Sequence, residues 1–501
     1  MIFRDWLKEL DYTLLQGSVD VETEDVIYDS RKAAPGKVFV AMKGIRVDGH
    51  SFIPQVLKAG VRVLVTERPV EEELKNSGLS EEELKQVTVV MVEEGRHALA
   101  LLSAARFDHP AKKLVMIGVT GTKGKTTTTH MIRAILLAAG KKVGMIGTTG
   151  TVIGDVVTPT LNTTPESYEL HQAFAQMVEA GCEYAVMEVS SQGIKMHRTD
   201  GLYFNYAIFT NISPDHIGPG EHADFEEYLY YKTRLLNMCG IGLVNKDDKH
   251  APQIIKAANC ELYTYSEESK EADFVASDIR YVPQPDFVGT EFHISGKYDM
   301  EVRLGIPGLF NVVNALAAVS VCSFLGLDQA RISHALENIR VNGRMEIVYT
   351  SERCTVLVDY AHNAVSMESL LSTLRDYKPK RLVCVFGCGG NRSKDRRYSM
   401  GEIGGKMADL SIITADTSRY EKVEDIIADI RGSIEKTGGK FIEIPDRREA
   451  IRYSILHAQP GDMVAVIGKG HEDYQEINGV RHHFLDREVI EETVKELGEK
   501  A

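Results

Sequence analysis

The stretch LVMIGVTGTKGKTTTTHMIRAILLAAG, residues 114–140, constrains the fold more than any other part of the chain. Its continuous apolar run predicts a buried strand, and the periodic run at its end predicts a helix. Between them, Gly121 and Gly124 allow backbone N–H groups to curl around an anion at the positive end of that helix. Lys125 can then reach terminal phosphates, and the Thr126 hydroxyl can bind Mg²⁺. The segment predicts an ATP or GTP site in an α/β protein.

The same alternation of short apolar runs with helical patterns continues along all 501 residues. Strands that alternate with helices predict parallel sheets with right-handed crossovers. Changes in pattern divide the chain into residues 1–110, 111–342 and 343–501. We therefore expect fold class α/β with three domains in series: an N-terminal α/β domain, a central P-loop ATPase-like parallel sheet domain and a C-terminal Rossmann-like α/β domain.

Composition narrows the choice of partners. The formal net charge is −14 and there is no long basic run, which argues against binding to nucleic acid or to anionic membranes. No apolar run approaches membrane-spanning length, and the N-terminal MIFRDWLKEL is not a signal peptide, so we expect no membrane insertion. The seven cysteines are scattered without a CxxC pair, which is typical of reduced thiols in a cytoplasmic protein.

Polar residues follow two further predicted strands of the central block. Glu188 ends the strand in AVMEVSSQG, and Asp215 and His216 follow the strand in YAIFTNISPDHIG. Because ligands of open parallel sheets bind at the carboxyl ends of strands, these side chains should face the crevice of the phosphate loop. Alone, Glu188 would be a structural or surface group. Beside the phosphate-loop Thr126 it becomes a candidate Mg²⁺ ligand.

One lysine occupies an unexpected position on a predicted helix, residues 224–238 (DFEEYLYYKTRLLNM). Leu229 and Leu235 mark the apolar face, and Lys232 lies three residues from each of them. Its stem could lie along apolar surface with the ammonium in water. Alternatively, a buried lysine has a lowered pKa and a neutral, reactive amine. Periodicity alone leaves both interpretations open.

Four predicted strands of the C-terminal block also end in polar groups, in VLVDYAHN, LVCVFGCGGNR, SIITADTSR and VAVIGKGHED. These four loops should converge at one sheet edge. Arg392 and Arg419 could bind carboxylates, and Asp416 and Glu472 could bind ammonium groups. Charged loop residues are usually solvated, but their shared position at strand ends favours a zwitterionic ligand.

A set of motifs then occurs in a fixed order: TGTKGKTT, LNTTPES, MEVSS, FTNISPDH, YKTRLL, NVVNALAA, GRME, VDYAHN, GCGGNRSKDRR and GKGHEDY. Over nearly its whole length the chain resembles the Mur ligase family, and most closely the UDP-N-acetylmuramoyl-tripeptide synthetase branch. The resemblance implies an ATP-dependent acid–amino-acid ligase of peptidoglycan synthesis. It would add meso-diaminopimelate or L-lysine to UDP-MurNAc-L-Ala-D-Glu through an acyl phosphate. Separately from the resemblance, we expect a cytoplasmic protein and a monomer.

The resemblance also implies roles for the three domains and for individual residues. The N-terminal domain would hold the UDP-MurNAc end, the central domain ATP and the C-terminal domain the amino acid. Two Mg²⁺ ions would be held by Thr126, Glu188, His216 and Lys232, the lysine as a carbamate formed with CO₂. Lys125, Lys232, His216 and Glu188 would be catalytic. For ATP the resemblance implies Gly121, Thr122, Lys123, Gly124, Lys125, Thr126, Thr127, Asn314, Arg344 and Asp359; for the UDP-MurNAc-dipeptide, Ser30, Ile45, Arg46, Val47, Asn162, Thr163, Thr164, Ser190 and Arg198; for the amino acid, Arg392, Asp416, Thr417, Ser418, Arg419, Gly468 and Glu472.

The identity of the amino acid stays open at this point. Diaminopimelate enzymes of the family carry Asp-Asn-Pro-Arg where this chain has DTSR, residues 416–419. The retained Arg419 suits the distal carboxylate of diaminopimelate and favours it slightly, whereas DHIGPGEH and DYAHN look more like lysine-adding relatives. The alternatives are another ligase of the superfamily, such as a folylpolyglutamate synthase or a different Mur step, and a P-loop ATPase switch. NTTPES and the N-terminal DSR argue against the folate enzyme.

Overall fold

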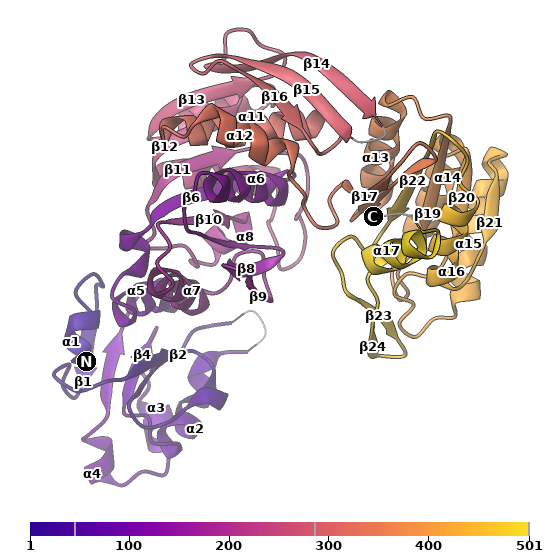
Figure 1. Cartoon of the computed structure of the whole chain (residues 1–501). Helices are drawn as coiled ribbons and strands as arrows, with labels where there is room; N and C mark the ends of the chain where they lie inside the picture. The colour runs from indigo at the N-terminus through magenta and orange to yellow at the C-terminus, as the bar shows by residue number, and fades with distance from the viewer. Residues whose placement is uncertain (45–46, 285–286, 499–501) are drawn as a thin grey trace. The chain divides into compact units, whose positions relative to one another are not determined.

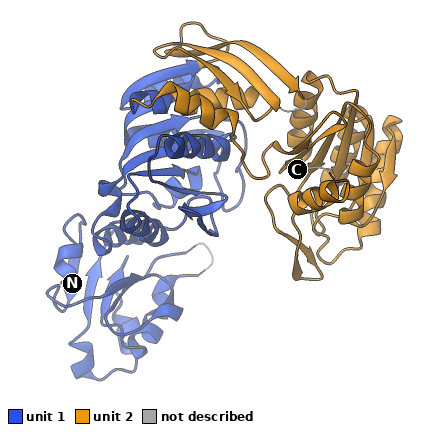
Figure 2. Ribbon diagram, in the orientation of Figure 1, with its two compact units in different colours: residues 1–265, 320–325 blue, residues 266–319, 326–501 orange. Residues whose placement is uncertain are grey.

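Three larger sheets and a two-stranded hairpin organise the chain (Figure 1). The structure is a computed structural model that describes residues 1–44, 47–284 and 287–498. It forms two compact units, residues 1–265 with 320–325, and residues 266–319 with 326–501 (Figure 2). None of the helices in the described part of the chain has the length and apolar content that crossing a membrane requires.

The first sheet of unit 1 has the strand order β1-β5-β4-β3-β2. β2 to β5 are parallel and β1 pairs antiparallel with β5. Val38 and Val40 pack into one buried cluster and Phe39 into another, so both faces of this sheet are covered, as in other parallel sheets. The elements are α1 Phe3–Trp6, β1 Thr13–Gln16, β2 Asp25–Ile27, β3 Lys37–Val40, α2 Ile53–Lys58, β4 Val63–Thr66, α3 Glu71–Lys75, α4 Glu81–Leu84, β5 Thr88–Met91 and α5 Gly95–Arg106.

The second sheet of unit 1 carries the phosphate loop, with strands in the order β13-β12-β11-β6-β10-β7-β8-β9. β13 to β7 are parallel, and β8 and β9 are antiparallel additions at the edge. The elements are β6 Val115–Thr120, α6 Lys125–Ala138, β7 Val143–Gly147, β8 Gly150–Ile153, β9 Val156–Thr158, α7 Ser167–Glu179, β10 Tyr184–Glu188, α8 Ser191–Lys195, β11 Phe204–Phe209, α9 Phe225–Thr233, β12 Cys239–Asn245, α10 Ala251–Ala257 and β13 Glu261–Ser266.

Unit 2 begins with an antiparallel meander, β14 to β16, which the sequence patterns did not predict. Its main sheet has the order β17-β18-β22-β19-β20-β21, parallel except for β17. The elements are β14 Phe274–Gln284, β15 Phe287–Gly296, β16 Met300–Leu304, α11 Leu309–Phe324 (whose last residues belong to unit 1), α12 Gln329–Glu337, β17 Glu346–Thr350, β18 Cys354–Asp359, α13 Ala364–Asp376, β19 Arg381–Phe386, α14 Lys394–Met407, β20 Leu410–Ile413, α15 Val423–Thr437, β21 Phe441–Glu443, α16 Arg447–Leu456, β22 Asp462–Ile467, β23 Tyr474–Ile477, β24 Val480–His483 and α17 Asp486–Glu496.

The predicted α/β class with parallel sheets is confirmed. The predicted helix over 224–238 is also present, with one change: the α-helix ends at Thr233 and continues as a 3₁₀ turn, Arg234–Asn237. Asp224 caps its start by accepting a hydrogen bond from the N–H of Glu227 at 2.8 Å. The local sequence therefore determines where the helix that carries Lys232 begins.

His171 of α7 gives this fold a defined weakness in acid. Its side chain is buried and, among the described residues, neither ring nitrogen has a hydrogen-bond partner. Burial lowers its pKa to about 3, against about 6.5 in an unfolded chain. Because only the unfolded state binds this proton between those values, the free energy of unfolding should fall by about 1.4 kcal/mol per pH unit below about pH 6.5. Urea unfolding of His171→Met at pH 7.5 and 5.5 should show a smaller loss on acidification than wild type. Equal losses would contradict the assignment.

Candidate functional site

The phosphate loop joins β6 to α6 through two glycines with left-handed backbone. Gly121 has φ of 145° and Gly124, the N-cap of α6, has φ of 86°. A Cβ at position 121 would lie 1.9 Å from the Thr210 hydroxyl oxygen, so only glycine fits there. Lys125 donates from Nζ to the carbonyls of Gly121 at 2.9 Å and Thr122 at 3.1 Å. The loop thus has the curled backbone that the sequence predicts, and the Lys125 side chain folds back over it.

Glu188 lies beside this loop because β10 pairs with β6 in parallel register. Its carboxylate is 1% exposed and accepts hydrogen bonds from the Thr126 hydroxyl at 3.0 Å and the Thr148 N–H at 2.9 Å. A Cβ at Gly147 would lie 2.3 Å from the same carboxylate oxygen, so a glycine makes room for it. A buried carboxylate beside a hydroxyl is a set of hard oxygen donors that suits Mg²⁺.

Lys232 is buried, with 2% of its surface exposed. Its Nζ donates to the Gly121 carbonyl at 2.7 Å and lies 4.7 Å from the centre of the Tyr228 ring. Burial, assisted by the positive charge of Lys125, lowers the Lys232 pKa well below its usual range. The side chain is therefore buried against the phosphate loop, which contradicts the interpretation as a snorkelling surface lysine and favours a buried amine with a lowered pKa.

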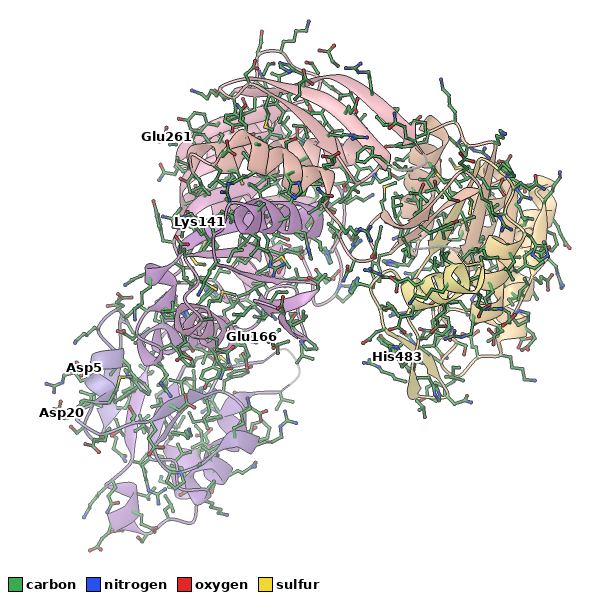
Figure 3. All side chains as sticks on the ribbon, viewed as in Figure 1. Asp5, Asp20, Lys141, Glu166, Glu261 and His483 are labelled. Atoms are coloured by element: carbon green, nitrogen blue, oxygen red, sulfur yellow. The ribbon has the colours of Figure 1, made fainter. Side chains whose placement is uncertain are left out.

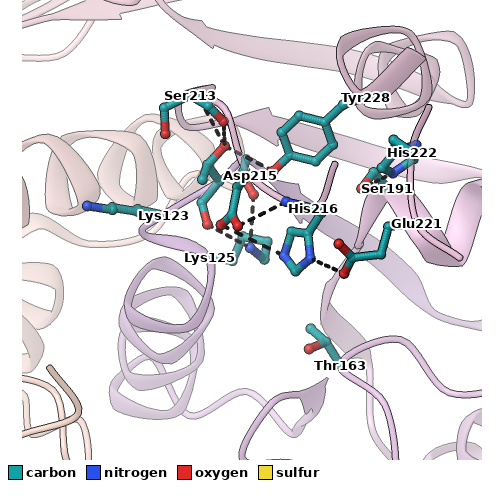
Figure 4. A network of polar contacts seen from close by, with 12 residues as sticks. Lys123, Lys125, Thr163, Ser191, Ser213, Asp215, His216, Glu221, His222 and Tyr228 are labelled. Carbon is teal, nitrogen blue, oxygen red and sulfur yellow. Dashed lines mark hydrogen bonds and ion pairs between the residues drawn. The ribbon is translucent and has the colours of Figure 1, made fainter. Parts of the chain in front are cut away.

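His216 approaches the same loop through Tyr228 (Figure 4). Its ring centre lies 6.1 Å from that of Tyr228, whose hydroxyl is 3.0 Å from the Thr122 hydroxyl. His216 has a left-handed backbone, φ 54°, which is uncommon outside glycine, and its Nδ1 is 3.1 Å from a carboxylate oxygen of Glu221. The imidazole is about half exposed, so it keeps access to solvent.

The residues expected at the muramoyl-dipeptide surround the end of β10. The Thr164 hydroxyl donates to the Glu188 carbonyl at 3.0 Å and accepts from the Ser190 N–H at 2.9 Å. Arg198 donates to the Thr164 carbonyl at 3.0 Å. The Thr163 hydroxyl is 3.2 Å from that of Thr148, and Asn162 is exposed. Four of the five predicted residues therefore adjoin the Glu188 strand end.

The expected uridine-site residues lie in the first sheet of unit 1. Ser30 opens a 3₁₀ turn, Ser30–Lys32, in which Asp29 accepts from the Arg31 N–H at 3.0 Å. Val47 is exposed, and Ile45 and Arg46 lie outside the described residues. Within unit 1, the Tyr28 hydroxyl, just after β2, donates to Glu169 of helix α7 at 2.9 Å.

In unit 2, Arg344 and Asp359 lie together at the start of the last sheet. Asp359 accepts from the N–H groups of Met345 and Ala361, each at 2.8 Å, and burial raises its pKa despite the nearby Arg344. The Arg344 guanidinium lies 4.9 Å from the centre of the Tyr360 ring. Asn314 is buried in α11, with its side-chain amide donating to the Asn311 side chain at 3.2 Å.

The four loops predicted to converge do contact one another. The Gly390 N–H donates to the Thr417 carbonyl at 2.9 Å, and Arg419 Nη1 lies 3.4 Å from the Gly390 carbonyl oxygen. A Cβ at Gly468 would lie 2.8 Å from an Asp416 carboxylate oxygen. The Tyr360 hydroxyl donates to Glu472 at 3.2 Å. Thr417 and Ser418 are buried, whereas Arg392 is exposed.

Comparison with known proteins identifies the family. Three family models match in order: Mur ligase family, catalytic domain, at residues 23–107; Mur ligase middle domain at 119–322; and Mur ligase, glutamate ligase domain at 343–470. A relative from Caldanaerobacter subterraneus, named UDP-N-acetylmuramoyl-L-alanyl-D-glutamate--2,6-diaminopimelate ligase, is 39% identical over 98% of both chains. One of the same name from Clostridium perfringens is 37% identical over 98% of this chain and 99% of its own.

The chain belongs to the Mur ligase family. A solved structure named UDP-N-acetylmuramoyl-L-alanyl-D-glutamate--2,6-diaminopimelate ligase matches with a TM-score of 0.72 at 29% identity, covering 95% of this chain and 96% of that one. Folylpolyglutamate synthase from Thermotoga maritima matches with a TM-score of 0.58 at 18% identity, over 74% of this chain and 89% of that one, and shares the fold alone. The resemblance inferred from the motifs is confirmed.

This Mur ligase also places residues at the site that sequence reasoning missed. Tyr228 contacts Thr122, His216 and Lys232, although nothing in the sequence pattern separates it from the other apolar residues of its helix. The sequence feature that could have identified Tyr228 as a site residue is its position one helical turn before Lys232. Lys469, within GKGHEDY, is fully buried and lies 3.5 Å from Glu472. Nothing in a glycine-rich loop distinguishes such a lysine from a solvated one.

Another missed group links two sequence-distant parts of unit 1. Glu166, labelled in Figure 3, pairs with Arg198 at 2.7 Å and with Arg96 of α5 at 3.3 Å. Asp200 accepts from His97, also on α5, at 2.7 Å and from His197 at 2.8 Å. The segment that carries Arg198 is thereby held against α5 on both sides.

Proposed function

We propose that this chain is the ATP-dependent ligase that adds meso-diaminopimelate, as the third residue, to UDP-MurNAc-L-Ala-D-Glu in peptidoglycan synthesis. The observation that carries the proposal is the buried Lys232, whose amine donates to the Gly121 carbonyl of a phosphate loop in which Thr126 meets Glu188. Relatives with 36–39% identity over nearly the full chain are named for that ligase activity, which supports the same assignment.

ATP and Mg²⁺ fit the groups around the phosphate loop. When bound, they supply the phosphoryl group that activates the D-Glu carboxylate and the charge that offsets repulsion between two anions. Lys125, which now donates to two carbonyls of its own loop, would exchange them for phosphate oxygens. Thr126 and Glu188 would hold one ion. Asn314, Arg344 and Asp359 are proposed as further ATP contacts.

For Lys232 we propose carbamylation. The neutral amine attacks the carbon of CO₂ and a proton leaves to water, so that a cation becomes an anion suited to a second Mg²⁺ near His216. The burial of Lys232 and its lowered pKa favour this reaction, because only the unprotonated amine is nucleophilic.

The remaining assignments follow the domain division 1–110, 111–342 and 343–501, which the positions of the three family models support. The first domain would bind UDP through Ser30 and residues 45–47. Thr163, Thr164, Ser190 and Arg198 would hold the muramoyl-dipeptide, with Asn162 joining them. We also propose a cytoplasmic monomer, in agreement with the scattered cysteines and the acidic composition.

Diaminopimelate is favoured over L-lysine because of Arg419. Both amino acids carry two ammonium groups, which Asp416 and Glu472 would bind, but only diaminopimelate has a distal carboxylate for a guanidinium. The contacts of the DTSR loop with Gly390 support a formed pocket despite the missing Asn-Pro pair.

Phosphate release tests the proposal directly. With ATP and Mg²⁺, we expect phosphate only when both UDP-MurNAc-L-Ala-D-Glu and an amino acid are present, with kcat/KM for meso-diaminopimelate at least about tenfold above L-lysine, the value of one charge-assisted contact. Rapid release with ATP alone would indicate a P-loop switch instead. Faster turnover with L-lysine would contradict the assignment of the amino acid. Use of a different UDP-precursor would contradict the assignment of the reaction step.

A further inference from the structure

The hairpin β23–β24 directly follows the GKGHEDY motif and extends from unit 2 below α17 in Figure 1. Its two strands join through Asn478 and Gly479, which both have positive φ, 51° and 77°, as a tight two-residue hairpin turn requires. Most of its residues are exposed. An isolated two-stranded sheet is only marginally stable in water, so its contacts with the rest of unit 2 decide its position.

Those contacts run along the amino-acid loop, residues 416–419. Gln475 donates from its side chain to the Asp416 carbonyl at 3.1 Å. At the other end of the loop, the Arg419 N–H donates to the Glu476 carbonyl at 2.9 Å, and the Asn478 N–H donates to the Arg419 carbonyl at 2.6 Å. Arg419 thereby forms a parallel β-bridge with Ile477, so the end of β23 pairs with this loop.

Arg419 needs such support because its own backbone is disfavoured. Its φ is 52°, a left-handed conformation that residues with a Cβ adopt only where their surroundings determine it. Both of its backbone polar groups are bonded to the hairpin, and the next residue, Tyr420, donates its N–H to the Asn391 side chain at 3.2 Å. The direction in which the Arg419 side chain leaves the loop is therefore fixed by β23.

The base of the hairpin is anchored by Lys469. This fully buried lysine donates from Nζ to the Tyr474 carbonyl at the first residue of β23, and it lies 3.5 Å from Glu472. The Tyr474 ring is covered by Arg481 of β24, whose guanidinium carbon lies 4.3 Å from the ring centre. One buried lysine thus ties the start of the hairpin to the Glu472 carboxylate.

We propose that the hairpin β23–β24 positions the pocket for the incoming amino acid and determines its selectivity for a diamino acid with a distal carboxylate. Gln475, Asn478 and Lys469 are positioning residues: they act through Asp416, Arg419 and Glu472. Hydrogen bonds to the hairpin hold both ends of the DTSR loop. The proposal rests on the proposed function, in which Arg419 receives the distal carboxylate.

Two variants test it in the full-length enzyme. Gln475→Met removes one donor at constant length and should raise the KM for meso-diaminopimelate about three- to tenfold, the value of one net hydrogen bond. Gly479→Val should raise it by more than about tenfold, since a Cβ there would lie 2.5 Å from the Tyr420 hydroxyl oxygen and a β-branched residue disfavours positive φ. The KM values for ATP and the UDP-precursor should stay unchanged, and the preference over L-lysine should fall in parallel.

His482→Ser, an exposed change on β24, is the matched control and should leave all constants unchanged. Thermal melting within a few degrees of wild type shows that the variants are folded. If Gln475→Met and Gly479→Val leave the diaminopimelate KM and the lysine preference as in wild type, or if they change all three KM values equally, the positioning role is wrong. The wild-type enzyme is measured first. If it uses neither amino acid, that result contradicts the proposed function and not the positioning role of the hairpin.

Discussion

Lys232→Ala should lower the rate of phosphate release in the presence of both substrates by at least about a hundredfold. The variant loses the only amine on this helix that is buried against the phosphate loop within the described residues, and with it the carbamate proposed to hold a metal ion. Truncation opens space beside the Gly121 carbonyl and the Tyr228 ring. Acetate or formate, which supply a carboxylate group to that space, should restore part of the activity.

The control is Lys256→Ala, on α10 of the same unit. The Lys256 side chain is exposed, and the residue lies outside the proposed site. Activity should therefore stay within about threefold of wild type, as for other surface changes. Full activity in Lys232→Ala would contradict the proposed role of Lys232 in metal binding. Wild-type enzyme freed of CO₂ should lose activity and regain it with bicarbonate, and unchanged activity there would exclude carbamylation.

Glu188→Gln is expected to have an effect of similar size. The amide keeps the shape of the side chain but removes the charge, so kcat/KM should fall about a hundredfold or more and saturation should require more Mg²⁺. The new NH₂ group would also face donors, the Thr148 N–H and the Thr126 hydroxyl, which we expect to cost about 1–3 kcal/mol of stability. A Mg²⁺ titration of phosphate release, with melting curves, separates these effects.

Glu183→Gln is the matched control, because Glu183 precedes the first residue of the same strand and forms an exposed pair with Lys141 at 3.1 Å. Exposed ion pairs contribute little to stability, so the rate of phosphate release and its Mg²⁺ dependence should match wild type. An unchanged Mg²⁺ dependence in Glu188→Gln would show that the carboxylate is structural.

The parts of the site that could be predicted from sequence are those determined by short-range patterns. Strand, glycine turn and helix are adjacent at 114–140, and a parallel sheet aligns the ends of its strands. The meeting of Thr126 with Glu188 follows from those two facts, and it is observed at 3.0 Å. The convergence of the C-terminal loops was predictable for the same reason.

Other features depend on what packs against a residue, which periodicity does not encode. Lys232 is buried by a loop 111 residues earlier in the chain, so its own helix left two interpretations open. Lys469 and the contacts of β23 with Arg419 depend equally on long-range packing. The meander β14–β16 was missed because its alternating strands lie within a block interpreted as strand-helix repeats.

The Gly121 carbonyl accepts from two lysines at once, Lys125 at 2.9 Å and Lys232 at 2.7 Å. Two amines on one oxygen oppose each other when both are protonated, and Lys125 accordingly depresses the pKa of its neighbour. Carbamylation would turn that repulsion into attraction. By thermodynamic reciprocity, nucleotide and metal binding would then strengthen with dissolved CO₂, and CO₂ uptake with nucleotide binding. The apparent affinity for ATP in this enzyme would thus vary with the inorganic carbon of its surroundings.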